Sequence, residues 1–184
     1  MTQHLNSIVE VSTALQNGQV GLFPCDTIWG IIGTLATADT IRNIKQRSKQ
    51  SPFICLIPST KHLATVSLPI ATEYETELNK WWPGPVTIIA PKSPSIPNTV
   101  TAGKSSIAIR VPKFQPLNEL LNQLNAPLIS TSANISGTSH PLSISDISPE
   151  LLDACGFIYD ACEPGSNTPS TIIDCTSYPP KTLR

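Results

Sequence analysis

Apolar residues recur along this chain with two spacings, one typical of helices and one of buried strands. Segments with apolar positions three or four apart predict helices at 7–15, 37–47, 72–82 and 116–124, and a short helix begins at Pro149. Short apolar runs between them predict strands at 20–23, 53–57, 86–90, 107–111, 128–131, 157–159 and 171–174. This alternation indicates an α/β or mixed α+β layered sheet. No repeat or linker divides residues 1–184, so we expect a single domain.

The composition predicts a soluble, cytoplasmic protein. With 184 residues, 40% of them hydrophobic, the chain can bury roughly 70% of the surface that it exposes when unfolded. Its five cysteines are odd in number and form no Cys-x-x-Cys pair, which favours reduced thiols over disulfides or a zinc site. The N-terminus lacks a basic stretch followed by an apolar core, and no apolar run approaches the ~20 residues of a membrane span.

Charge is segregated along the chain, although the formal net charge is only −1. Residues 1–39 carry three acids and no Lys or Arg, residues 40–118 carry ten basic residues against three acids, and residues 119–184 carry seven acids against two basic residues. Within the middle region, the windows 40–72 and 78–118 contain no acid at all. A pocket for a polyanionic small molecule needs such a concentration of positive charge, and a solvated basic face would show it too.

The stretch at 126–137 is the strongest candidate for chemistry. It reads Ala-Pro-Leu-Ile-Ser-Thr-Ser-Ala-Asn-Ile-Ser-Gly, so an apolar strand leads directly into four hydroxyls, one carboxamide and a glycine. Hydroxyls, Asn134 and backbone N–H groups at the end of a strand indicate an anion site at the edge of a sheet. The alternative is a hydroxyl-rich turn whose side chains only cap the local backbone.

The predicted helix at 37–47 offers a second group of candidates. It would place Arg42, Lys45 and Lys49 on one face, whereas Arg47 would point elsewhere near the helix end. Lysine suits phosphate and arginine suits a carboxylate. The alternative is that these charges only compensate the helix C-terminus.

Residues 83–87, Pro-Gly-Pro-Val-Thr, form a rigid turn that leads into a strand. The Thr87 hydroxyl would then lie at the edge of the sheet. Alone, this motif is more typical of a turn than of a site.

Taken together, the motifs resemble those of the YrdC-type family of threonylcarbamoyl-adenylate synthases. The resemblance covers most of the chain and rests on Pro24-Cys-Asp-Thr-Ile-Trp-Gly-Ile31, Lys45-Gln-Arg47 followed by Pro52-Phe53, Trp82-Pro-Gly-Pro-Val-Thr87, Arg110-Val-Pro112, Ser130-Thr-Ser-Ala-Asn-Ile-Ser-Gly137 and Ser170-Thr-Ile-Ile-Asp174. Each motif alone is weak, but the ordered series at family spacing is specific. The resemblance implies a twisted open sheet flanked by helices, the YrdC/RibB-like fold.

The reaction implied by this resemblance converts L-threonine, bicarbonate or CO2, and ATP into L-threonylcarbamoyl-AMP and pyrophosphate. The product would supply downstream threonylcarbamoyl-transferase proteins, which modify the tRNA adenosine next to the anticodon. The threonine amine is carboxylated first, and a carbamate oxygen then attacks the α-phosphorus of ATP. The task of the protein is positioning and charge neutralisation, which fits a basic pocket without an evident nucleophile. A weak contact with tRNA is compatible with the basic middle region, and no membrane is expected.

The resemblance also implies roles for individual residues. The implied catalytic residues are Lys45 and Arg47. The implied substrate-binding residues are Thr27, Arg47, Thr87, Arg110 and Ser132. The implied nucleotide-binding residues are Lys45, Arg110, Ser130, Ser132, Asn134 and Ser170. No residue is implied as a metal ligand, because few carboxylates lie near these motifs, and Mg²⁺ would be carried by the nucleotide.

The chain departs from the family pattern at several positions. Cys25 replaces the first Thr of its motif, Trp29 replaces the usual Tyr, and Ser51 stands where many members carry Lys or Asn. Between 160 and 170 the usual glycines are reduced to Gly165, which predicts a stiffer or differently shaped loop on the nucleotide side. In length the chain corresponds to the short, single-domain form of the family.

Three other functions remain as alternatives. A YrdC-fold paralogue could bind nucleotide or RNA without adenylating activity, although the presence of Lys45, Arg47, Ser132 and Asn134 argues against it. A sugar-phosphate lyase of related fold, such as dihydroxybutanone-phosphate synthase, would need clustered acids, and none cluster in this sequence. A pure RNA-binding module would be strongly basic, whereas the pI of this chain is about 6.3.

Overall fold

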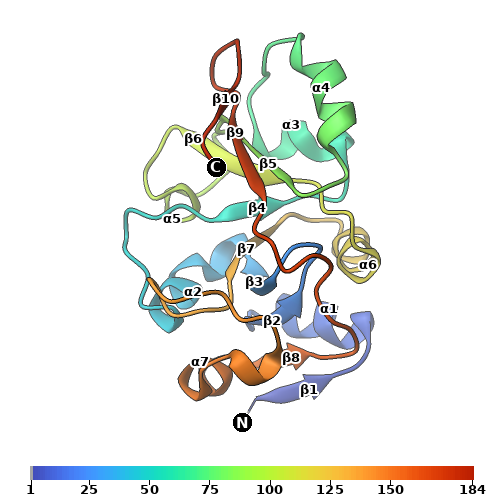
Figure 1. Cartoon of the computed structure of the whole chain (residues 1–184), viewed down its shortest axis with the longest axis vertical. Coiled ribbons are helices and arrows are strands. Elements are labelled where there is room, and N and C mark those ends of the chain that lie inside the picture. The colour runs from blue at the N-terminus through green and yellow to red at the C-terminus, as the bar shows by residue number, and fades with distance from the viewer. Residues whose placement is uncertain (1) are drawn as a thin grey trace.

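A mixed ten-stranded sheet runs through residues 2–184, the part of the chain that the computed structural model describes. Its strands are β1 (Gln3–Leu5), β2 (Gly21–Pro24), β3 (Trp29–Thr34), β4 (Ile54–Leu56), β5 (Val86–Pro91), β6 (Ser106–Arg110), β7 (Leu128–Ser132), β8 (Phe157–Tyr159), β9 (Thr171–Asp174) and β10 (Lys181–Thr182). They lie in the order β1-β8-β2-β3-β7-β4-β6-β5-β9-β10. In Figure 1 this order runs from the N-terminus at the bottom to the β9–β10 hairpin at the top.

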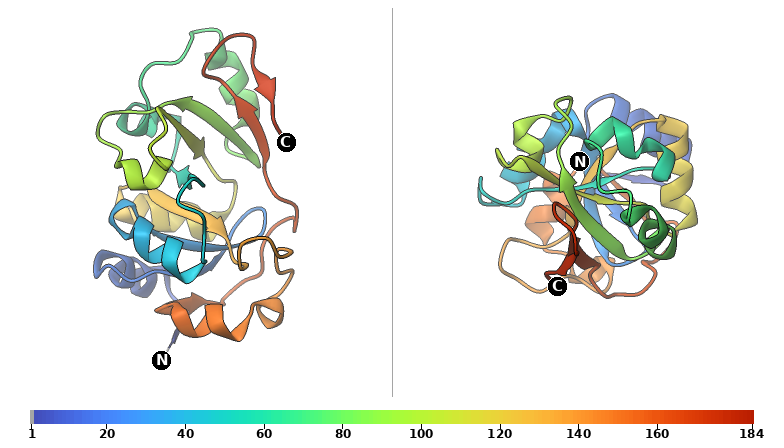
Figure 2. Two further views of the ribbon diagram at one scale, coloured as in Figure 1. Left: turned by 90° about the vertical axis from the view of Figure 1, so that its left-hand side faces the viewer. Right: turned by 90° about the horizontal axis from the view of Figure 1, so that it is seen from above.

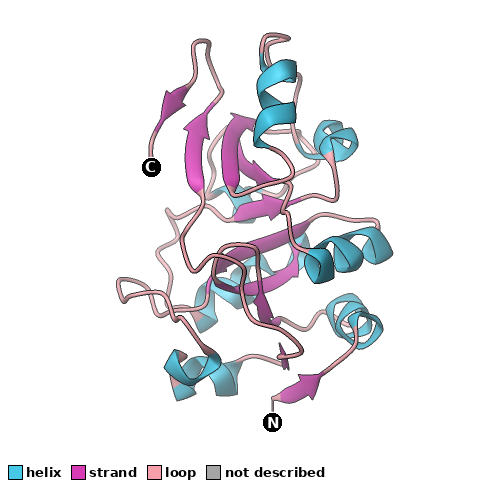
Figure 3. Ribbon diagram, turned by 45° about the vertical axis from the view of Figure 1, so that its right-hand side comes forward, coloured by secondary structure: helices cyan, strands magenta, loops and turns pink. Residues whose placement is uncertain are grey.

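Helices surround this sheet, as Figures 2 and 3 show. They are α1 (Ile8–Gln16), α2 (Ala38–Ile44), α3 (Leu63–Val66), α4 (Tyr74–Trp81), α5 (Asn98–Thr101), α6 (Gln115–Leu124) and α7 (Pro149–Ala154), together with 3-10 turns at Leu35–Thr37, Thr60–His62 and Ile144–Asp146. A sheet flanked by helices confirms the predicted α/β fold class. None of the helices in the described part of the chain is long and apolar enough to cross a membrane.

The boundaries of α1 illustrate how local sequence sets an element. The Ser7 hydroxyl accepts the Glu10 N–H at 3.2 Å, and the Glu10 carboxylate accepts the Ser7 N–H at 3.1 Å. This reciprocal capping box satisfies N–H groups that the first helical turn leaves free. The helix ends before Gly18, whose φ of 77° favours glycine. The helix predicted at 7–15 is therefore confirmed.

Two hydrophobic cores attach the helices to the sheet. In one core, α1 and α6 pack against β2 and β8, where the rings of Phe23 and Tyr159 stack with centroids 4.7 Å apart. The other core is larger and receives Ile41 from α2, Leu78 from α4 and Leu151 from α7. Burying such side chains contributes about 25 cal/mol per Å² of apolar surface, so these two cores hold the strands in register.

The register around β7 gathers the polar ends of several strands. β7 pairs antiparallel with β3, opposing Ser132 to Gly30, and antiparallel with β4, opposing Ser130 to Ile54. On its other side β4 pairs parallel with β6, which opposes Ile54 to Ala108. The hydroxyl-rich end of β7 therefore lies between segments that are far apart in the sequence.

The predicted helix at 37–47 is shorter than expected, and its predicted basic face was wrong. A 3-10 turn precedes α2, the helix ends at Ile44, and Gln46 adopts a left-handed φ of 50°. Lys49 therefore lies beyond the helix and is exposed, whereas Arg42 is buried and donates to the Ser48, Ser51 and Thr99 carbonyls. Helical periodicity stops where the backbone turns, so spacings that extend past Ile44 have no common face.

Strand β3 was not predicted, because glycines interrupt its apolar run. A Cβ at Gly33 would lie 2.2 Å from Thr37 Oγ1 and 3.0 Å from Ile41 Cδ1. Glycine thus allows the segment that leads into α2 to approach the sheet closely. The short elements β1, α3, α5 and β10 were not predicted either, since two to four residues are too few to show a period.

Candidate active site

A cavity of about 620 Å³ lies where the ends of β2, β3 and β7 meet β4, β6 and β9. Seven of the predicted site residues line it: Thr27, Arg47, Arg110, Ser130, Ser132, Asn134 and Ser170. The lining also carries Lys104 and Arg184, which gives four cationic side chains, and in the described chain it includes no Asp or Glu. A concave surface with an excess of positive charge attracts anions and shields them from water.

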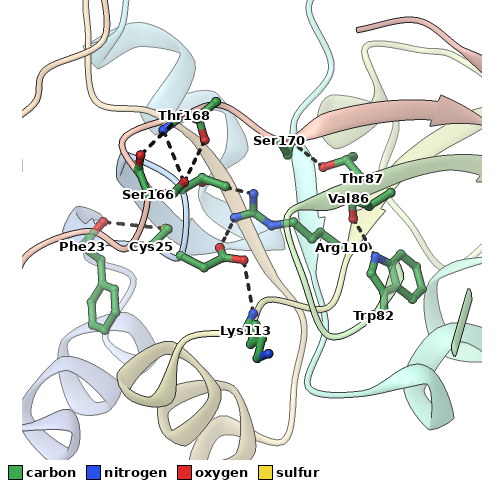
Figure 4. Close-up of polar contacts among 12 residues, drawn as sticks. Phe23, Cys25, Trp82, Val86, Thr87, Arg110, Lys113, Ser166, Thr168 and Ser170 are labelled. Atoms are coloured by element: carbon green, nitrogen blue, oxygen red, sulfur yellow. Dashed lines mark hydrogen bonds and ion pairs between the residues drawn. The ribbon is translucent and has the colours of Figure 1, made fainter. Parts of the chain in front are cut away.

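Arg110, at the end of β6, is buried at the centre of the site (Figure 4). Its Nη1 donates to Thr27 Oγ1 at 3.2 Å, and its Nη2 lies 3.1 Å from Asp26 Oδ1. The other Asp26 oxygen accepts the Lys113 N–H at 3.2 Å. The Arg110 Nε has no hydrogen-bond partner among residues 2–184. A buried N–H without a partner is costly, so the Arg110 guanidinium carries an unsatisfied donor at the centre of the site.

A hydroxyl pair joins β5 to the loop before β9. Thr87 Oγ1 and Ser170 Oγ lie 2.9 Å apart, and Figure 4 shows the two side chains facing each other. Thr87 is fully buried, whereas Ser170 lines the cavity. Arg184 closes this side, because its Nε and Nη2 donate to the Ser170 carbonyl at 3.1 and 3.0 Å. Thr87 therefore supports the wall through Ser170 instead of forming the wall itself.

Lys45 also lies behind the wall, held by the hydroxyl-rich end of β7. Its side chain is 2% exposed, and its ammonium donates to Ser132 Oγ at 2.9 Å, to Asn134 Oδ1 at 2.8 Å and to the Ser132 carbonyl. Ser132 Oγ in turn donates to Asn134 Oδ1 at 2.6 Å, and Asn134 Nδ2 donates to the Thr138 carbonyl. Lys45 thus reaches the cavity only through Ser132 and Asn134.

This burial changes the ionisation of Lys45. Loss of solvent, with a smaller contribution from the positive charge of Arg47, lowers the pKa of Lys45 from 10.5 to about 7. All three ammonium protons face acceptors, which keeps the charged form tolerable in this position. The arrangement suits a residue that fixes the geometry of the β7 end.

Arg47 approaches the cavity from the turn that follows α2. Its Nη1 donates to Thr131 Oγ1 at 3.1 Å, its Nη2 donates to the Pro52 carbonyl at 2.9 Å, and its guanidinium lies over the Phe53 ring at 5.6 Å. Burial, and then the charge of Arg42, lower the pKa of Arg47 from its ordinary value. These contacts hold the guanidinium in one orientation, as recognition of a carboxylate or phosphate requires.

Close packing shapes the floor beside Ser130. A Cβ at Gly30 would lie 3.1 Å from Ser130 Oγ and 3.3 Å from Cys25 Sγ, so the glycine leaves room for both groups. Burial raises the pKa of the Cys25 thiol to about 12. A thiol that stays protonated at neutral pH is no nucleophile, so Cys25 acts here as a small apolar wall.

The loop at 160–170 docks onto the site through Gly165. Its N–H donates to the Cys25 carbonyl at 2.9 Å, and a Cβ would lie 2.6 Å from the Asp26 carbonyl oxygen. The single glycine of this loop therefore lies where a side chain would collide with backbone. Local bonds between Ser166 and Thr168, visible in Figure 4, and a 3.3 Å contact from His140 Nε2 to the Asn167 carbonyl shape the remainder.

Sequence reasoning missed three charged or titratable residues that line the cavity: Lys104, His140 and Arg184. Lys104 lies within an acid-free window, so the charge pattern included it, but nothing in the sequence placed it at the cavity. Arg184 reaches the site because β10 pairs antiparallel with β9 and carries the chain back to Ser170. No local pattern in the sequence indicates that pairing.

Comparisons with known proteins agree with this geometry. The family model Sua5/YciO/YrdC, described as telomere recombination, matches residues 13–184. The chain is 30% identical over 173 residues to a threonylcarbamoyl-AMP synthase of Pyrococcus abyssi, which covers 92% of this chain and 51% of that protein. It is 32% identical over 179 residues to a threonylcarbamoyl-AMP synthase of Xylella fastidiosa, which covers 93% of this chain and 94% of that protein. A crystal structure of P. abyssi Sua5 complexed with L-threonine superposes with a TM-score of 0.92 at 27% identity, covering 100% of this chain and 57% of that one.

The fold and the cavity define an α/β protein with a cationic pocket at the ends of its strands. Together with the match over residues 13–184, they show that the chain belongs to the Sua5/YciO/YrdC family, which confirms the resemblance seen in the motifs. The chain spans about half the length of the P. abyssi relative and nearly all of the X. fastidiosa relative.

Proposed function

We propose that this protein is an L-threonylcarbamoyladenylate synthase, which forms L-threonylcarbamoyl-AMP and pyrophosphate from L-threonine, bicarbonate or CO2, and ATP. The observation that carries the proposal is a cavity with four cationic side chains and no carboxylate in the lining described above. Its volume of about 620 Å³ lies within the range of small-molecule sites. The relatives named threonylcarbamoyl-AMP synthase, and the P. abyssi Sua5 structure that contains L-threonine, support the same activity.

The chemistry requires positioning and charge neutralisation. The threonine amine attacks the carbon of CO2 or bicarbonate and loses a proton, and water is released when bicarbonate is the donor. A carbamate oxygen then attacks the α-phosphorus of ATP, and the bond to the pyrophosphate oxygen breaks with that oxygen leaving in line. Negative charge accumulates on the phosphoryl oxygens, so fixed cations around them lower the barrier. The guanidiniums of Arg47 and Arg110, which the protein holds in fixed positions, would supply such cations.

The predicted residues divide into two groups in this proposal. Thr27, Arg47, Arg110, Ser130, Ser132, Asn134 and Ser170 line the cavity and would contact threonine, carbamate or nucleotide. Lys45 and Thr87 lie behind them and would act by positioning Ser132, Asn134 and Ser170. Lys45 was assigned a catalytic role in the sequence analysis, and its contacts favour a positioning role instead.

Mg²⁺ would enter the site as part of its complex with ATP. Residues 2–184 contain no group of three or more His, Cys, Asp or Glu side chains that could hold a metal ion. Asp26, which stands between the lining residues Cys25 and Thr27, is paired with Arg110. Phosphate oxygens and water would therefore supply most of the ligands of the ion.

The product of this reaction is an activated acyl-adenylate, which hydrolyses readily and needs a consumer. We propose that it passes to downstream threonylcarbamoyl-transferase proteins that modify the tRNA adenosine next to the anticodon. Direct contact with tRNA would be weak, because the formal net charge is −1 and affinity for nucleic acid depends on an excess of positive charge. A cytoplasmic location fits this role.

Incorporation of labelled bicarbonate into an adenylate tests the proposal. We expect ATP-dependent and threonine-dependent formation of threonylcarbamoyl-AMP, with one pyrophosphate released per product. Serine should be a poor substrate, because one methyl group is worth only ~1–3 kcal/mol of discrimination. Arg110→Ala should lower the rate by about 100-fold or more. Lys61→Ala is the matched control, since Lys61 is exposed in a 3-10 turn outside the cavity lining.

The same assay separates the alternative function. A paralogue that only binds nucleotide or RNA would bind ATP but release no pyrophosphate when threonine and bicarbonate are added. That result, with the wild-type protein folded, would overturn the synthase proposal.

A further inference from the structure

Lys104 differs from the three arginines that line the same cavity. Arg47 is bound to Thr131 and Pro52, Arg110 to Thr27 and Asp26, and Arg184 to the Ser170 carbonyl. Within residues 2–184, by contrast, the Lys104 ammonium forms no hydrogen bond and no ion pair. It is thus the one cation of the lining, in the described chain, whose charged group forms no bond to the protein.

The backbone that carries Lys104 is held in place. The segment after α5 passes through two left-handed residues, Ala102 with a φ of 56° and Gly103 with a φ of 76°. Gly103 N–H donates to the Asn98 carbonyl at 2.9 Å, Lys104 N–H donates to the Thr101 carbonyl at 3.1 Å, and Thr101 Oγ1 donates to the Lys104 carbonyl at 3.1 Å. An alanine in the left-handed region costs free energy, and such strain persists only where the surrounding structure fixes it.

Helix α5 is also tied to the basic wall of the site. Arg42 Nη2 donates to the Thr99 carbonyl at 2.7 Å, and Phe53 N–H donates to the Val100 carbonyl at 3.0 Å. These bonds set α5 beside the segment that carries Gln50 and Ser51, which line the cavity together with Lys104. All three residues have polar side chains, and Lys104 is the charged member.

Exposure indicates which part of a ligand Lys104 would meet. Thr27, Arg110 and Ser170 are buried, whereas Lys104 and Gln50 are exposed, so Lys104 belongs to the mouth of the cavity. A flexible lysine side chain on a fixed backbone can follow a ligand group that moves, whereas the arginines are held by hydrogen bonds. The terminal phosphates of a nucleoside triphosphate are such a moving group, because they leave as pyrophosphate.

We propose that Lys104 binds the terminal phosphates of ATP at the mouth of the cavity and accompanies the departing pyrophosphate. The role in pyrophosphate departure rests on the proposed synthase function, whereas the phosphate contact itself does not. Gln50 and Ser51 line the same cavity without a charge, so Lys104 supplies the positive charge of this part of the lining.

Calorimetric titration of purified wild-type protein, Lys104→Ala, Lys104→Arg and Lys61→Ala with ATP, pyrophosphate, AMP and L-threonine tests this inference. We expect Lys104→Ala to bind ATP and pyrophosphate about tenfold more weakly, with AMP and L-threonine unchanged within twofold. Lys104→Arg should retain most of the affinity because it keeps the charge. Lys61→Ala should match the wild type, and melting curves should show that every variant is folded.

Each other result overturns the inference. Unchanged ATP and pyrophosphate binding in Lys104→Ala would show that the charge is not used. Equal weakening of AMP and ATP binding would place Lys104 at the α-phosphate. If the wild type bound neither ATP nor pyrophosphate, Lys104 would have no phosphate ligand and the inference would be wrong. These outcomes are distinct from failure of the synthase proposal, in which ATP binds but no threonine-dependent pyrophosphate appears.

Discussion

Arg110 Nη2 and Asp26 Oδ1 lie 3.1 Å apart in an ion pair whose side chains are only 4% and 6% exposed. Asp26 Oδ1 has no aligned hydrogen-bond donor among residues 2–184, so the pair is held by charge more than by hydrogen-bond geometry. Asp26 follows β2 and Arg110 ends β6, and the three strands β3, β7 and β4 lie between β2 and β6 in the sheet. The contact therefore fixes the two sides of the cavity relative to each other.

Replacing Asp26 with Asn should destabilise the protein by about 3 kcal/mol, because it leaves the Arg110 guanidinium buried without its counter-charge. Urea unfolding of the wild type and variant measures this difference. Asp39→Asn is the control, since the Asp39 side chain is 70% exposed and lies 3.9 Å from Arg42. Its effect should stay within about 0.5 kcal/mol. Equal effects of the two substitutions would contradict a structural role for the buried pair.

The buried ammonium of Lys45 should make stability depend on pH. Because the pKa of Lys45 is about 7 in the folded protein and 10.5 is its ordinary value, the unfolded chain binds more protons between these values. Below about pH 7 the folded protein bears the whole free-energy cost of burying the Lys45 charge. As the pH rises above this value, Lys45 loses its proton in the folded protein and the free energy of unfolding increases. Relative to Lys45→Met, the wild type should gain about 2 kcal/mol of unfolding free energy between about pH 7 and pH 9.

Urea titrations of both proteins across this range test the expectation. Lys61→Met is the control, and its difference from the wild type should not change with pH because Lys61 is exposed. A constant difference between the wild type and Lys45→Met would show that Lys45 keeps its ordinary pKa.

Much of the fold could be predicted because most elements are long enough to show a period. The helices at α1, α4 and α6 and the strands β4 to β9 all lie within a few residues of their predicted ranges. Strand β3 could not be found this way, since Gly30 and Gly33 serve close packing and break its apolar pattern. The end of α2 was misplaced because nothing in the sequence signalled the left-handed turn at Gln46.

The sequence predicted many of the residues that form the site but not how they are arranged in it. Family motifs indicated Arg47, Arg110 and Ser132, which line the cavity. The motifs could not show that Lys45 stands behind Ser132, because that depends on how the turn after α2 packs against β7. Lys104 and Arg184 reach the cavity from outside the motifs, so only the three-dimensional pairing of distant segments reveals them.

The docking of Gly165 onto Asp26 predicts a large effect of a small substitution. Gly165→Ala would bring a methyl group to 2.6 Å from the Asp26 carbonyl oxygen, so either the loop or the Asp26 backbone must shift. We expect at least a tenfold loss in synthase activity, because a displacement of about 1 Å at a site can cost about 100-fold. Glu163→Ala, an exposed change in the same loop, should retain activity. Normal activity of Gly165→Ala would show that the loop adapts freely.

The hydroxyl-rich end of β7 allows the two interpretations of that stretch to be separated. Asn134 Oδ1 accepts from both Lys45 and Ser132, so its carboxamide joins the buried ammonium to the loop that lines the cavity. Asn134→Ala should lower ATP affinity about tenfold, since the loop loses the bonds that set its shape, and should lower the melting temperature by only a few degrees. Calorimetric ATP titration and thermal melting without ligand measure the two quantities.

A double-mutant cycle with Lys45→Met then tests whether Lys45 acts through Asn134. If the two side chains work as one unit, their effects on the free energy of unfolding should be non-additive by about 1 kcal/mol or more, because either substitution alone breaks the shared hydrogen bond. Thr13→Ala with Lys45→Met is the additive control, since Thr13 bonds only to the Val9 carbonyl within α1. Additive effects, together with a lower melting temperature and unchanged ATP binding in Asn134→Ala, would reduce the stretch to a turn that caps its own backbone.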